Sequence, residues 1–415
     1  MRRVSAGAAH RWHYNTDLMI SVAQGQAYIL ARVVRPLPAE PVAVTQALGR
    51  VLVRDVPAPF DVPPVDNSAV DGYAVRAADL VAGGHARLRI VSDLPAGSAY
   101  DGLVGAGETL RIMTGAPMPA GADTVVPQEL AEREDGTVRL GAVPAGANVR
   151  ARGEDVRSGV VVLRQGTVLR PQELGLLASL GLHEAWVHAR PRIALLSTGD
   201  EVVEPGLPRK PGQIYDANRF SLHGLVEAAG GTVIDFGIVP DLHDVLRARL
   251  LEAAEAADVV ITSGGVSVGV YDLVKQVLAE VGGIDFWQVA MQPGRPFAVG
   301  KIGESQFFGL PGNPVASMLC FLLFVRPALW KLGGRRELAP PHFTAIATEP
   351  MTKKPGRREF KRGILSFSER GWEVGTTGPQ GSGILSSMVL ANCLIVLEEP
   401  RGDVKPGEPV LVEPL

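Results

Sequence analysis

The residues with the clearest chemical potential lie in the loop 263–269, Ser-Gly-Gly-Val-Ser-Val-Gly. This loop follows the short apolar run 259–261 and precedes the amphipathic segment 272–281. That order is typical of a buried parallel strand, a loop at its carboxyl end and a helix. Glycines let the backbone approach a ligand closely, and free N–H groups and hydroxyls are the donors that a phosphate or another oxyanion needs. The loop predicts an oxyanion site, with an ordinary structural Gly-Gly turn as the alternative.

Four more apolar runs in the same region end in turns that combine glycine or proline with polar side chains. One shared site explains these five similar turns better than five independent coincidences do. We therefore expect all five strand ends to meet. The four turns are Ser197-Thr198-Gly199-Asp200-Glu201, Pro240-Asp241, Met291-Gln292-Pro293-Gly294-Arg295-Pro296 and Pro311-Gly312-Asn313-Pro314.

A sheet must bring these turns to one edge. The strand-like runs, such as 192–196 and 306–310, alternate with helical patterns such as 219–229 and 245–257. Alternating strands and helices imply a mostly parallel sheet that helices cover on both faces. In such sheets ligands bind in the crevice outside the carboxyl ends of the strands. The region is therefore predicted to be a doubly wound α/β domain with its site at that edge.

Composition limits the classes of function that the chain can have. A length of 415 residues suggests about three domains, and a net charge of −3 gives no field that attracts nucleic acid or an anionic membrane. The densest apolar run, 315–330, contains Arg326 and Pro327 and is predicted to be a buried helix instead of a membrane span. Cys320 and Cys393 lie in apolar segments without metal-ligand spacing, which suits small core residues in a reducing cytoplasm.

Turn composition divides the rest of the chain into further modules. The N-terminal segment lacks the apolar stretch of a signal peptide and is interpreted as a disordered extension or a misassigned start. Short β-like runs between Gly/Pro turns predict β-rich modules. The predicted parts are the extension (1–18), a split linker domain (19–50 and 149–190), an inserted β-rich domain (51–148), the α/β domain (191–335) and a C-terminal β-barrel (336–415).

The β-rich module contains acids and hydroxyls of its own. Asp66, Ser68 and Asp71 fall in one short loop, Thr114 ends a strand-like run, and Asp155 follows two arginines. These residue types suit the rim of an active site. Asx-turns and local charge pairs give the same pattern, however. The residues alone leave both interpretations open.

Nine motifs taken together resemble those of one enzyme family. They run in order from about Met19 to Leu415: DNSAVDGYAV, RIMTGAPMP, ARGEDV, LLSTGDE, TSGGVSVG, QPGRP, GLPGNPVAS, REFKRG and QGSGILSSMVLANCLIVLE. The chain is similar to the bacterial molybdopterin molybdenumtransferases, the MoeA family, which are relatives of the E domain of gephyrin. Because the motifs cross every predicted domain, the resemblance is highly specific.

The resemblance implies a fold, a reaction and an assembly. Family members are elongated homodimers with a split linker domain, an inserted β-rich domain, an α/β molybdopterin-binding domain and a C-terminal β-barrel. They insert molybdate into adenylylated molybdopterin in a magnesium-dependent step that releases AMP and forms molybdenum cofactor. The expected partners are a molybdopterin adenylyltransferase and downstream molybdenum-cofactor proteins, with no nucleic acid and no membrane. The expected location is the cytoplasm.

The resemblance also gives individual residues expected roles. Backbone N–H groups of the loops at 263–265 and 311–313 are expected to bind the pyrophosphate. Carboxylates suit magnesium, and arginines with hydroxyls suit molybdate, a small dianion. In family dimers the β-rich module faces the partner subunit's α/β domain, so its acids and hydroxyls are expected to complete a site there. The predicted residues are catalytic Asp272, Glu201, Asp241, Asp66, Thr114 and Asp155; substrate-binding Ser197, Thr198, Gly199, Asp200, Asn218, Ser263, Gly264, Gly265, Ser267, Arg295, Pro311, Gly312, Asn313, Ser317, Arg358, Ser386 and Ser387; and the metal ligands Glu201, Asp272 and Asp200.

Two departures from the family pattern bear on these roles. Val270 stands where an acidic residue is common, so Asp272 is expected to bind the cation alone in that turn. Gln292 and Arg295 stand where lysines are common, and arginine presents a planar fork instead of a point charge.

One rival function is another enzyme, and a second belongs to a different class. A molybdopterin adenylyltransferase-like nucleotide-binding enzyme normally stands as one small domain, which the other modules of this chain argue against. A dimeric scaffold of the gephyrin type would not need the acidic and hydroxyl residues of the loops, and this chain retains them.

Overall fold

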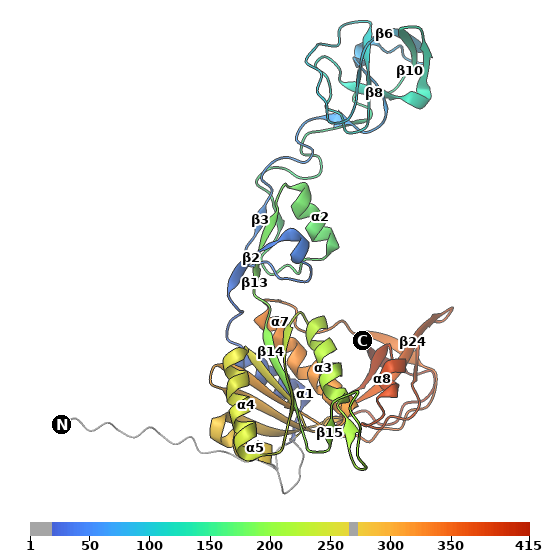
Figure 1. The fold of residues 1–415 in the computed structure, drawn as a ribbon. Helices are drawn as coiled ribbons and strands as arrows, with labels where there is room; N and C mark the ends of the chain where they lie inside the picture. The colour runs from blue at the N-terminus through green and yellow to red at the C-terminus, as the bar shows by residue number, and fades with distance from the viewer. Residues whose placement is uncertain (1–18, 265–272) are drawn as a thin grey trace, which may run out of the picture. The chain divides into compact units, whose positions relative to one another are not determined.

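The computed structural model of the protein describes residues 19–264 and 273–415 (Figure 1). The predicted site residues Gly265, Ser267 and Asp272 lie outside the described residues, as does the predicted extension. The chain divides into two compact units, which are taken separately below. One contains the chain up to Pro41, residues 49–53 and residues 186–415, and the other contains residues 42–48 and 54–185.

A seven-stranded sheet forms the centre of the first unit (Figure 1). Its order is β1–β19–β21–β22–β18–β14–β17. Neighbours pair in parallel except at β21, which is antiparallel to both β19 and β22. The sheet is thus mostly parallel, as predicted, with one antiparallel strand inserted. The strands are β1 (Met19–Ile20), β14 (Arg192–Thr198), β17 (Thr232–Val239), β18 (Val259–Ser263), β19 (Gly282–Val289), β21 (Pro296–Ile302) and β22 (Ser305–Leu310).

Alternate side chains of β14 enter two separate cores, one on each face of this sheet. Ile193 and Leu195 pack in one core, whereas Ala194 and Leu196 pack in the other. Figure 1 shows α3 and α4 on opposite sides of β14. The predicted doubly wound α/β fold is therefore confirmed. One face is covered by α4 (His243–Ala256) and α5 (Leu273–Val281), and the other by α1 (Val22–Arg32), α3 (Ala217–Ala228) and the helical stretch that begins at Pro314.

That helical stretch runs to Leu332 and forms the centre of the larger core. It consists of α6 (Pro314–Cys320), the π-helical turn η4 (Phe321–Val325) and α7 (Arg326–Leu332). Among the described residues it is the single helix long and apolar enough to span a membrane, with a mean hydropathy of 1.6, but 78% of its apolar window is buried inside the fold. It is a core helix, as predicted.

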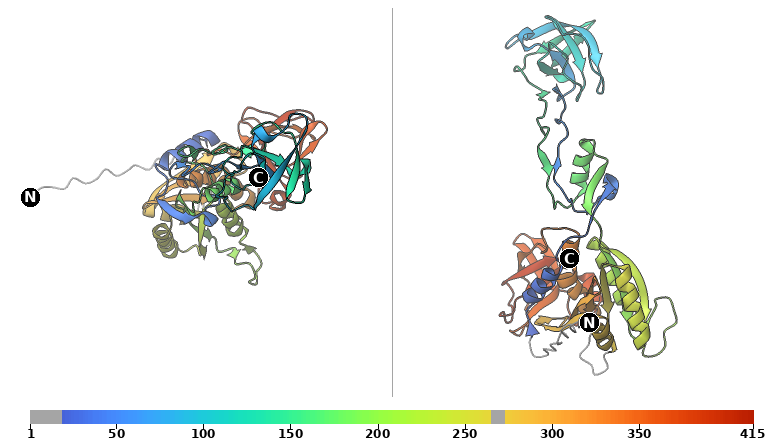
Figure 2. Two further views of the ribbon diagram at one scale, coloured as in Figure 1. Left: turned by 90° about the horizontal axis from the view of Figure 1, so that it is seen from above. Right: turned by 90° about the vertical axis from the view of Figure 1, so that its left-hand side faces the viewer.

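The C-terminal part of the first unit is a closed β-barrel that lies beside the α/β sheet (Figure 2). Five strands follow one another in the order β24–β25–β23–β27–β26, and pairing of β26 with β24 closes the ring. The start of β24 also pairs with β20 (Met291–Gln292) of the α/β domain. The predicted barrel is confirmed. Its elements are β23 (Phe343–Ala347), β24 (Arg358–Ser368), β25 (Gly371–Thr376), β26 (Cys393–Leu397), β27 (Pro409–Pro414) and α8 (Ser386–Leu390).

The second unit is built mainly of short strands, as predicted for the inserted module. Its largest sheet has the order β8–β5–β7–β6–β10–β9. Tyr73 and Val75 pack on one face of β5, and Ala74 packs on the other, so this small sheet also has two buried faces. The strands are β5 (Gly72–Val75), β6 (His85–Leu94), β7 (Glu108–Ile112), β8 (Thr124–Pro127), β9 (Ala131–Glu134) and β10 (Thr137–Gly141).

Residues at both ends of helix α2 (Pro171–Ser179) in the second unit fix where it starts and stops. Pro171 occupies the first turn, where its missing N–H costs nothing. The carboxylate of Glu173 accepts a hydrogen bond from the Arg170 N–H at 2.8 Å, which satisfies a donor at the helix start. Gly181 follows the helix with a φ of +72°, a conformation that glycine adopts without strain.

Candidate functional site

A cavity of about 560 Å³ lies at the carboxyl edge of the α/β sheet. This volume falls in the usual range of small-molecule sites, roughly 300–1,000 Å³. Turns at the ends of β14, β17, β18 and β22 all contribute to its wall, as does the turn from β20 to β21. The five strand ends therefore meet at one pocket. Its lining residues are Thr198, Gly199, Glu201, Asp241, Gly264, Met291, Gln292, Pro293, Gly294, Arg295, Pro296, Pro311, Gly312, Asn313, Ala316, Arg357, Gln380, Gly381 and Ser382.

The buried side chain of Asn218, at the start of α3, holds two of these turns together. Its Nδ2 donates to Ser263 Oγ at 2.7 Å and to the Gly312 carbonyl oxygen at 2.8 Å. The start of α3 is itself fixed, because the Asp216 carboxylate accepts from the Arg219 N–H and pairs with the Arg219 guanidinium at 3.0 Å. Asn218 thus sets the spacing between the turns that follow β18 and β22.

Gly264 occupies a position that only glycine fits. Its φ is +94°, and a Cβ there would lie 2.8 Å from the carbonyl oxygen of Thr198. Its N–H donates to the Leu310 carbonyl at 3.1 Å. The backbone of the turn after β18 therefore packs directly against the ends of the neighbouring strands β14 and β22. The pocket wall has no room for a side chain at this point.

Several hydroxyl groups at this edge are buried. The Oγ1 of Thr198 and the Oγ atoms of Ser197 and Ser317 make no hydrogen bond with any described residue. Buried polar atoms normally have partners, so each unpaired hydroxyl needs an explanation. Thr198 lines the pocket, and a bound ligand is the natural partner for its hydroxyl.

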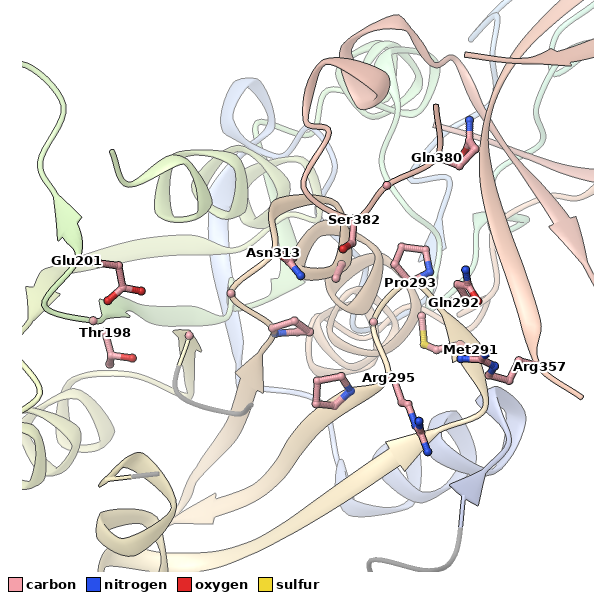
Figure 3. A pocket seen from close by; sticks show the side chains of 18 of the residues that line it. Thr198, Glu201, Met291, Gln292, Pro293, Arg295, Asn313, Arg357, Gln380 and Ser382 are labelled. Carbon is pink, nitrogen blue, oxygen red and sulfur yellow. The ribbon is translucent and has the colours of Figure 1, made fainter. Parts of the chain in front are cut away.

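The pocket has an acidic end and a basic end. Figure 3 shows Glu201 and Thr198 on one side, Arg295, Arg357 and Gln292 on the other, and Asn313 and Ser382 between them. The Arg295 guanidinium donates to Gln288 Oε1 at 2.6 Å, so this cation is held by a neutral partner. Separated charges of opposite sign suit a ligand set that brings a metal cation to one end and an anion to the other.

The basic end depends on the C-terminal barrel. Parallel pairing of β20 with β24 sets Met291 opposite Arg358 and brings the preceding Arg357 to the pocket. The turn Gln380-Gly381-Ser382 supplies the rest of this wall. The sequence analysis did not predict Arg357, Gln380 or Ser382 as site residues. The QGSG turn nevertheless combines glycine with polar side chains, as the predicted turns do.

Some predicted residues lie away from this pocket. Arg358 lines a separate cavity of about 270 Å³ and pairs with Glu399 at 3.2 Å. Arg357 lies in the bend just before β24 and lines the main pocket, whereas Arg358, the first residue of β24, lines the other cavity. Neither serine of the pair at 386 and 387 lines the pocket, and the Ser387 hydroxyl is bonded to Arg362 at 3.0 Å.

The remaining predicted residues of the first unit lie beside the wall. Asp200 accepts a hydrogen bond from the Asp241 N–H at 3.2 Å, which links the turns after β14 and β17. Asp200 itself does not line the pocket, whereas Glu201 and Asp241 do. Ser197, Ser263 and Ser317 are buried. The acidic end, as far as the described residues form it, thus has two carboxylates.

The predicted residues of the β-rich module lie in the second unit. Asp71 accepts from the Thr114 N–H at 2.8 Å and from its hydroxyl at 2.7 Å, and these bonds lower the pKa of the Asp71 carboxyl. Asp66 accepts from the Arg152 N–H at 2.7 Å. The Asp155 N–H donates to the Val62 carbonyl at 3.0 Å. These residues therefore belong to an ordered set of loops, in which hydrogen bonds from Thr114 favour the ionised form of Asp71.

Fold and pocket together define a class of protein. A doubly wound domain presents glycine turns, unpaired hydroxyls and charged side chains at the carboxyl edge of its strands, which is where such enzymes bind phosphate-bearing ligands. Three family models match consecutive parts of the chain. They are the MoeA N-terminal region, domains I and II (residues 20–181), a probable molybdopterin binding domain (194–331) and the MoeA C-terminal region, domain IV (344–415).

Relatives of similar length match almost the whole chain. The molybdopterin molybdenumtransferase of Haemophilus influenzae is 43% identical over 400 residues, which are 95% of this chain and 98% of that protein. Molybdopterin molybdenumtransferase 2 of Mycobacterium tuberculosis is 38% identical over 405 residues, which are 94% of this chain and 98% of that protein. The crystal structure of the molybdopterin biosynthesis MoeA protein from Pyrococcus horikoshii matches with a TM-score of 0.82 and 31% identity, covering 96% of this chain and all of that one. The chain belongs to the MoeA family.

Proposed function

We propose that this chain is a molybdopterin molybdenumtransferase, which inserts molybdate into adenylylated molybdopterin and releases AMP. The observation that supports this most directly is the pocket with a carboxylate end and an arginine end. Adenylylated molybdopterin brings a pyrophosphate, and molybdate brings a second anion. One pocket with two chemically different ends can hold both at once.

The pyrophosphate fits the carboxylate half of the pocket. Gly312 leaves space for a phosphate oxygen, because a Cβ there would meet no heavy atom closer than 3.9 Å. The Thr198 hydroxyl, which has no partner among the described residues, can donate to that oxygen. Asn218 fixes the distance between the turns after β18 and β22, so the site is preorganised before the substrate arrives. Water cleaves the phosphoanhydride bond; AMP leaves with one phosphate, and molybdopterin keeps the other.

Molybdate fits the arginine half. Arg295 and Arg357 offer charge-assisted hydrogen bonds, and Gln292 and Ser382 add neutral donors. As the nucleotide leaves, the two dithiolene thiols of the pterin bind molybdenum in place of one molybdate oxygen, which leaves as water with the two thiol protons. Arg358, in contrast, is neutralised by Glu399 and lines the other cavity.

Magnesium fits the carboxylate end only as an ion shared with the substrate. Within the described part of the chain no group of three or more His, Cys, Asp or Glu side chains could hold a metal. Mg²⁺ is usually held by one or two carboxylates together with waters and substrate phosphates. Glu201 and Asp241 would hold it here, with Asp272 as the further predicted ligand. When bound, it would neutralise charge on the pyrophosphate.

The assembly and location complete the proposal. We take the chain to act as a cytoplasmic homodimer in which Asp66, Thr114 and Asp155 of one subunit complete the pocket of the other. A molybdopterin adenylyltransferase would supply the substrate, and molybdenum-cofactor enzymes would receive the product. The support is the chemistry of the loops around Asp71 and Thr114, whose hydrogen bonds keep a carboxylate ionised.

The test is to incubate the purified chain with adenylylated molybdopterin, Mg²⁺ and molybdate, and to follow AMP release and cofactor formation. AMP release that depends on both Mg²⁺ and molybdate supports the proposal. A parallel reaction with molybdopterin and ATP tests the adenylyltransferase alternative. Adenylylation in that reaction, or no reaction in either, would contradict the proposed function.

A further inference from the structure

The turn that carries Arg357 to the pocket is exposed, yet it begins at a buried lysine. Lys354, Pro355 and Gly356 are all exposed, whereas Lys353 has only 3% of its surface exposed. Arg357 follows these residues and lines the basic end of the pocket (Figure 3). No described residue forms a hydrogen bond or an ion pair with the Arg357 side chain. The position of this guanidinium therefore depends on the turn from which it extends.

The ammonium group of Lys353 is surrounded by backbone carbonyls. Its Nζ donates to the Arg401 carbonyl oxygen at 2.8 Å, and the carbonyl oxygens of Lys354 and Glu399 lie 3.4 Å away. An ammonium has three N–H donors, so three carbonyls use all of them. Two of these carbonyls belong to residues 398–403, which follow β26 and are called the clasp loop below. Lys353 thus joins the turn to the clasp loop.

Two further hydrogen bonds join the same loop to the same turn. The Asp403 carboxylate accepts from the Lys353 N–H at 2.7 Å. The Glu399 carbonyl oxygen accepts from the Gly356 N–H at 2.8 Å. The clasp loop therefore holds the turn both where it begins and at the residue directly before Arg357.

The role of Lys353 in this contact requires a cation. Burial lowers the pKa of Lys353, and the carboxylates of Glu359 and Glu399 act in the opposite direction. Lys361, which pairs with Glu359 at 3.1 Å, adds a positive charge nearby. Hydrogen bonds from an ionised donor are roughly twice as strong as neutral ones. An apolar side chain at this position would leave the buried carbonyls without their donor, which is costly.

We propose that Lys353 is a positioning residue for the oxyanion: through the clasp loop it fixes the turn that presents Arg357 to the basic end of the pocket. Lys353 does not line the pocket itself and acts through Arg357. This inference rests on the proposed function for the identity of the oxyanion, molybdate. It gives a role to a buried lysine that the proposed reaction does not otherwise use.

The first test is calorimetric titration of the purified chain with molybdate in the absence of pterin. Lys353→Met keeps most of the side-chain length and removes the donors. The dissociation constant for molybdate should rise by about fivefold, less than for Arg357→Ala, because the guanidinium remains but is held less firmly. An unchanged dissociation constant would overturn the proposal.

A double-mutant cycle shows whether Lys353 acts through Arg357. In the Arg357→Ala background, Lys353→Met should weaken molybdate binding no further, because the group that it positions is already gone. If Lys353→Met has the same effect in both backgrounds, it acts independently of Arg357 and the proposal is wrong.

A second variant tests the clasp loop if Lys353→Met fails to fold. Asp403 is exposed, so Asp403→Ala should fold while losing the bond to the Lys353 N–H. Molybdate binding should weaken by about twofold or more, and only when Arg357 is present. Equal molybdate affinity in Asp403→Ala and the parent would contradict the proposal.

Glu413→Gln is the matched control for barrel stability. This buried carboxylate forms its ion pairs with Arg326 and His342 instead of the clasp loop. The variant should lower the melting temperature without changing the affinity for molybdate. If it weakens molybdate binding as much as Asp403→Ala does, lost barrel stability explains both effects and the proposal fails.

A kinetic comparison completes the design. In Lys353→Met the molybdate concentration for half-maximal AMP release should rise, while that for adenylylated molybdopterin should stay within about twofold, since the pyrophosphate binds at the other end. Equal rises in both would indicate a general defect and count against the proposal. If the parent chain binds molybdate but releases no AMP, the proposed function fails and this inference is still decided by the titrations. If the parent chain binds no molybdate, this inference fails.

Discussion

The side-chain amide of Asn218 donates to the hydroxyl of Ser263 at 2.7 Å and so ties the start of α3 to the end of β18. The same nitrogen reaches the Gly312 carbonyl at 2.8 Å. We expect Asn218→Ala to lose both bonds, each worth about 1 kcal/mol. The adenylylated-molybdopterin concentration for half-maximal AMP release should then rise by roughly tenfold or more. Kinetic titration checks this, and an unchanged value would show that the two turns keep their spacing without Asn218.

Glu201→Gln should reduce Mg²⁺-dependent AMP release by roughly a hundredfold or more, because the amide no longer attracts the cation. The melting temperature should change little, since the substitution preserves shape. Glu204→Gln is a matched control: Glu204 pairs with Arg219 and does not line the pocket. Asp272→Asn should behave like Glu201→Gln. Activity near that of the parent in both Glu201→Gln and Asp272→Asn would remove the proposed carboxylate role.

The adjacent arginines at the start of β24 give a sharp comparison. Arg357→Ala should raise the molybdate concentration needed for half-maximal insertion by about tenfold, because a charge-assisted bond to the oxyanion is lost. Excess molybdate should rescue it. Arg358→Ala leaves Glu399 without its partner and should mainly lower thermal stability. Should the molybdate requirement rise in Arg358→Ala instead, the original sequence-based assignment of Arg358 would be right.

Mixed dimers test the proposed shared site. Thr114→Ala removes the hydroxyl that donates to Asp71, and Glu201→Gln removes a pocket carboxylate. Each homodimer should be nearly inactive, whereas a heterodimer of the two should regain part of the activity, because one of its two sites combines intact halves. Coexpression with two affinity tags yields the heterodimer for AMP-release assays. If the mixed dimers are as inactive as the two variant homodimers, the shared-site model is excluded.

The Arg170–Glu173 pair predicts a dependence of stability on pH. Hydrogen bonds from the Arg170 guanidinium lower the pKa of Glu173 from its ordinary value of 4.5 to about 2. A lowered pKa in the folded state means that the stabilisation is complete above about pH 4.5 and is lost as the pH falls toward 2. Glu173→Gln should therefore melt at a lower temperature than the parent at pH 7, with the difference vanishing near pH 2. A difference independent of pH would refute the linkage.

Local sequence patterns predicted the α/β part of the fold well. The expected strands at 192–196 and 306–310 and the helix at 245–257 lie within two residues of the observed elements. Each is a buried strand or a helix, and the spacing of apolar residues within the segment itself indicates which of the two it is. The short β1, in contrast, consists of Met19 and Ile20 and exists only because it pairs with β19. No local pattern predicts a two-residue strand.

The candidate site was only partly predictable for a related reason. Turns at the ends of parallel strands meet by topology, so Thr198, Glu201 and Asn313 could be placed together from the sequence. Arg357 and Ser382 reach the same pocket through the pairing of β20 with β24 and through the Val315–Ser382 bond, which join segments far apart in the chain. To predict that Arg357 and not Arg358 lines the pocket, one must know which side of the chain faces the pocket at the start of β24. The pairing with the distant β20 determines this.

The bond between the Val315 N–H and the Ser382 carbonyl has a consequence for how the chain is made. A ribosome that has just finished the α/β domain has produced the acidic end of the pocket together with Gln292 and Arg295, whereas Arg357, Gln380 and Ser382 are still to be translated. A nascent or prematurely terminated chain therefore lacks the part of the basic wall that the barrel supplies. Only a polypeptide whose last strands have left the exit tunnel can assemble the complete wall of the pocket.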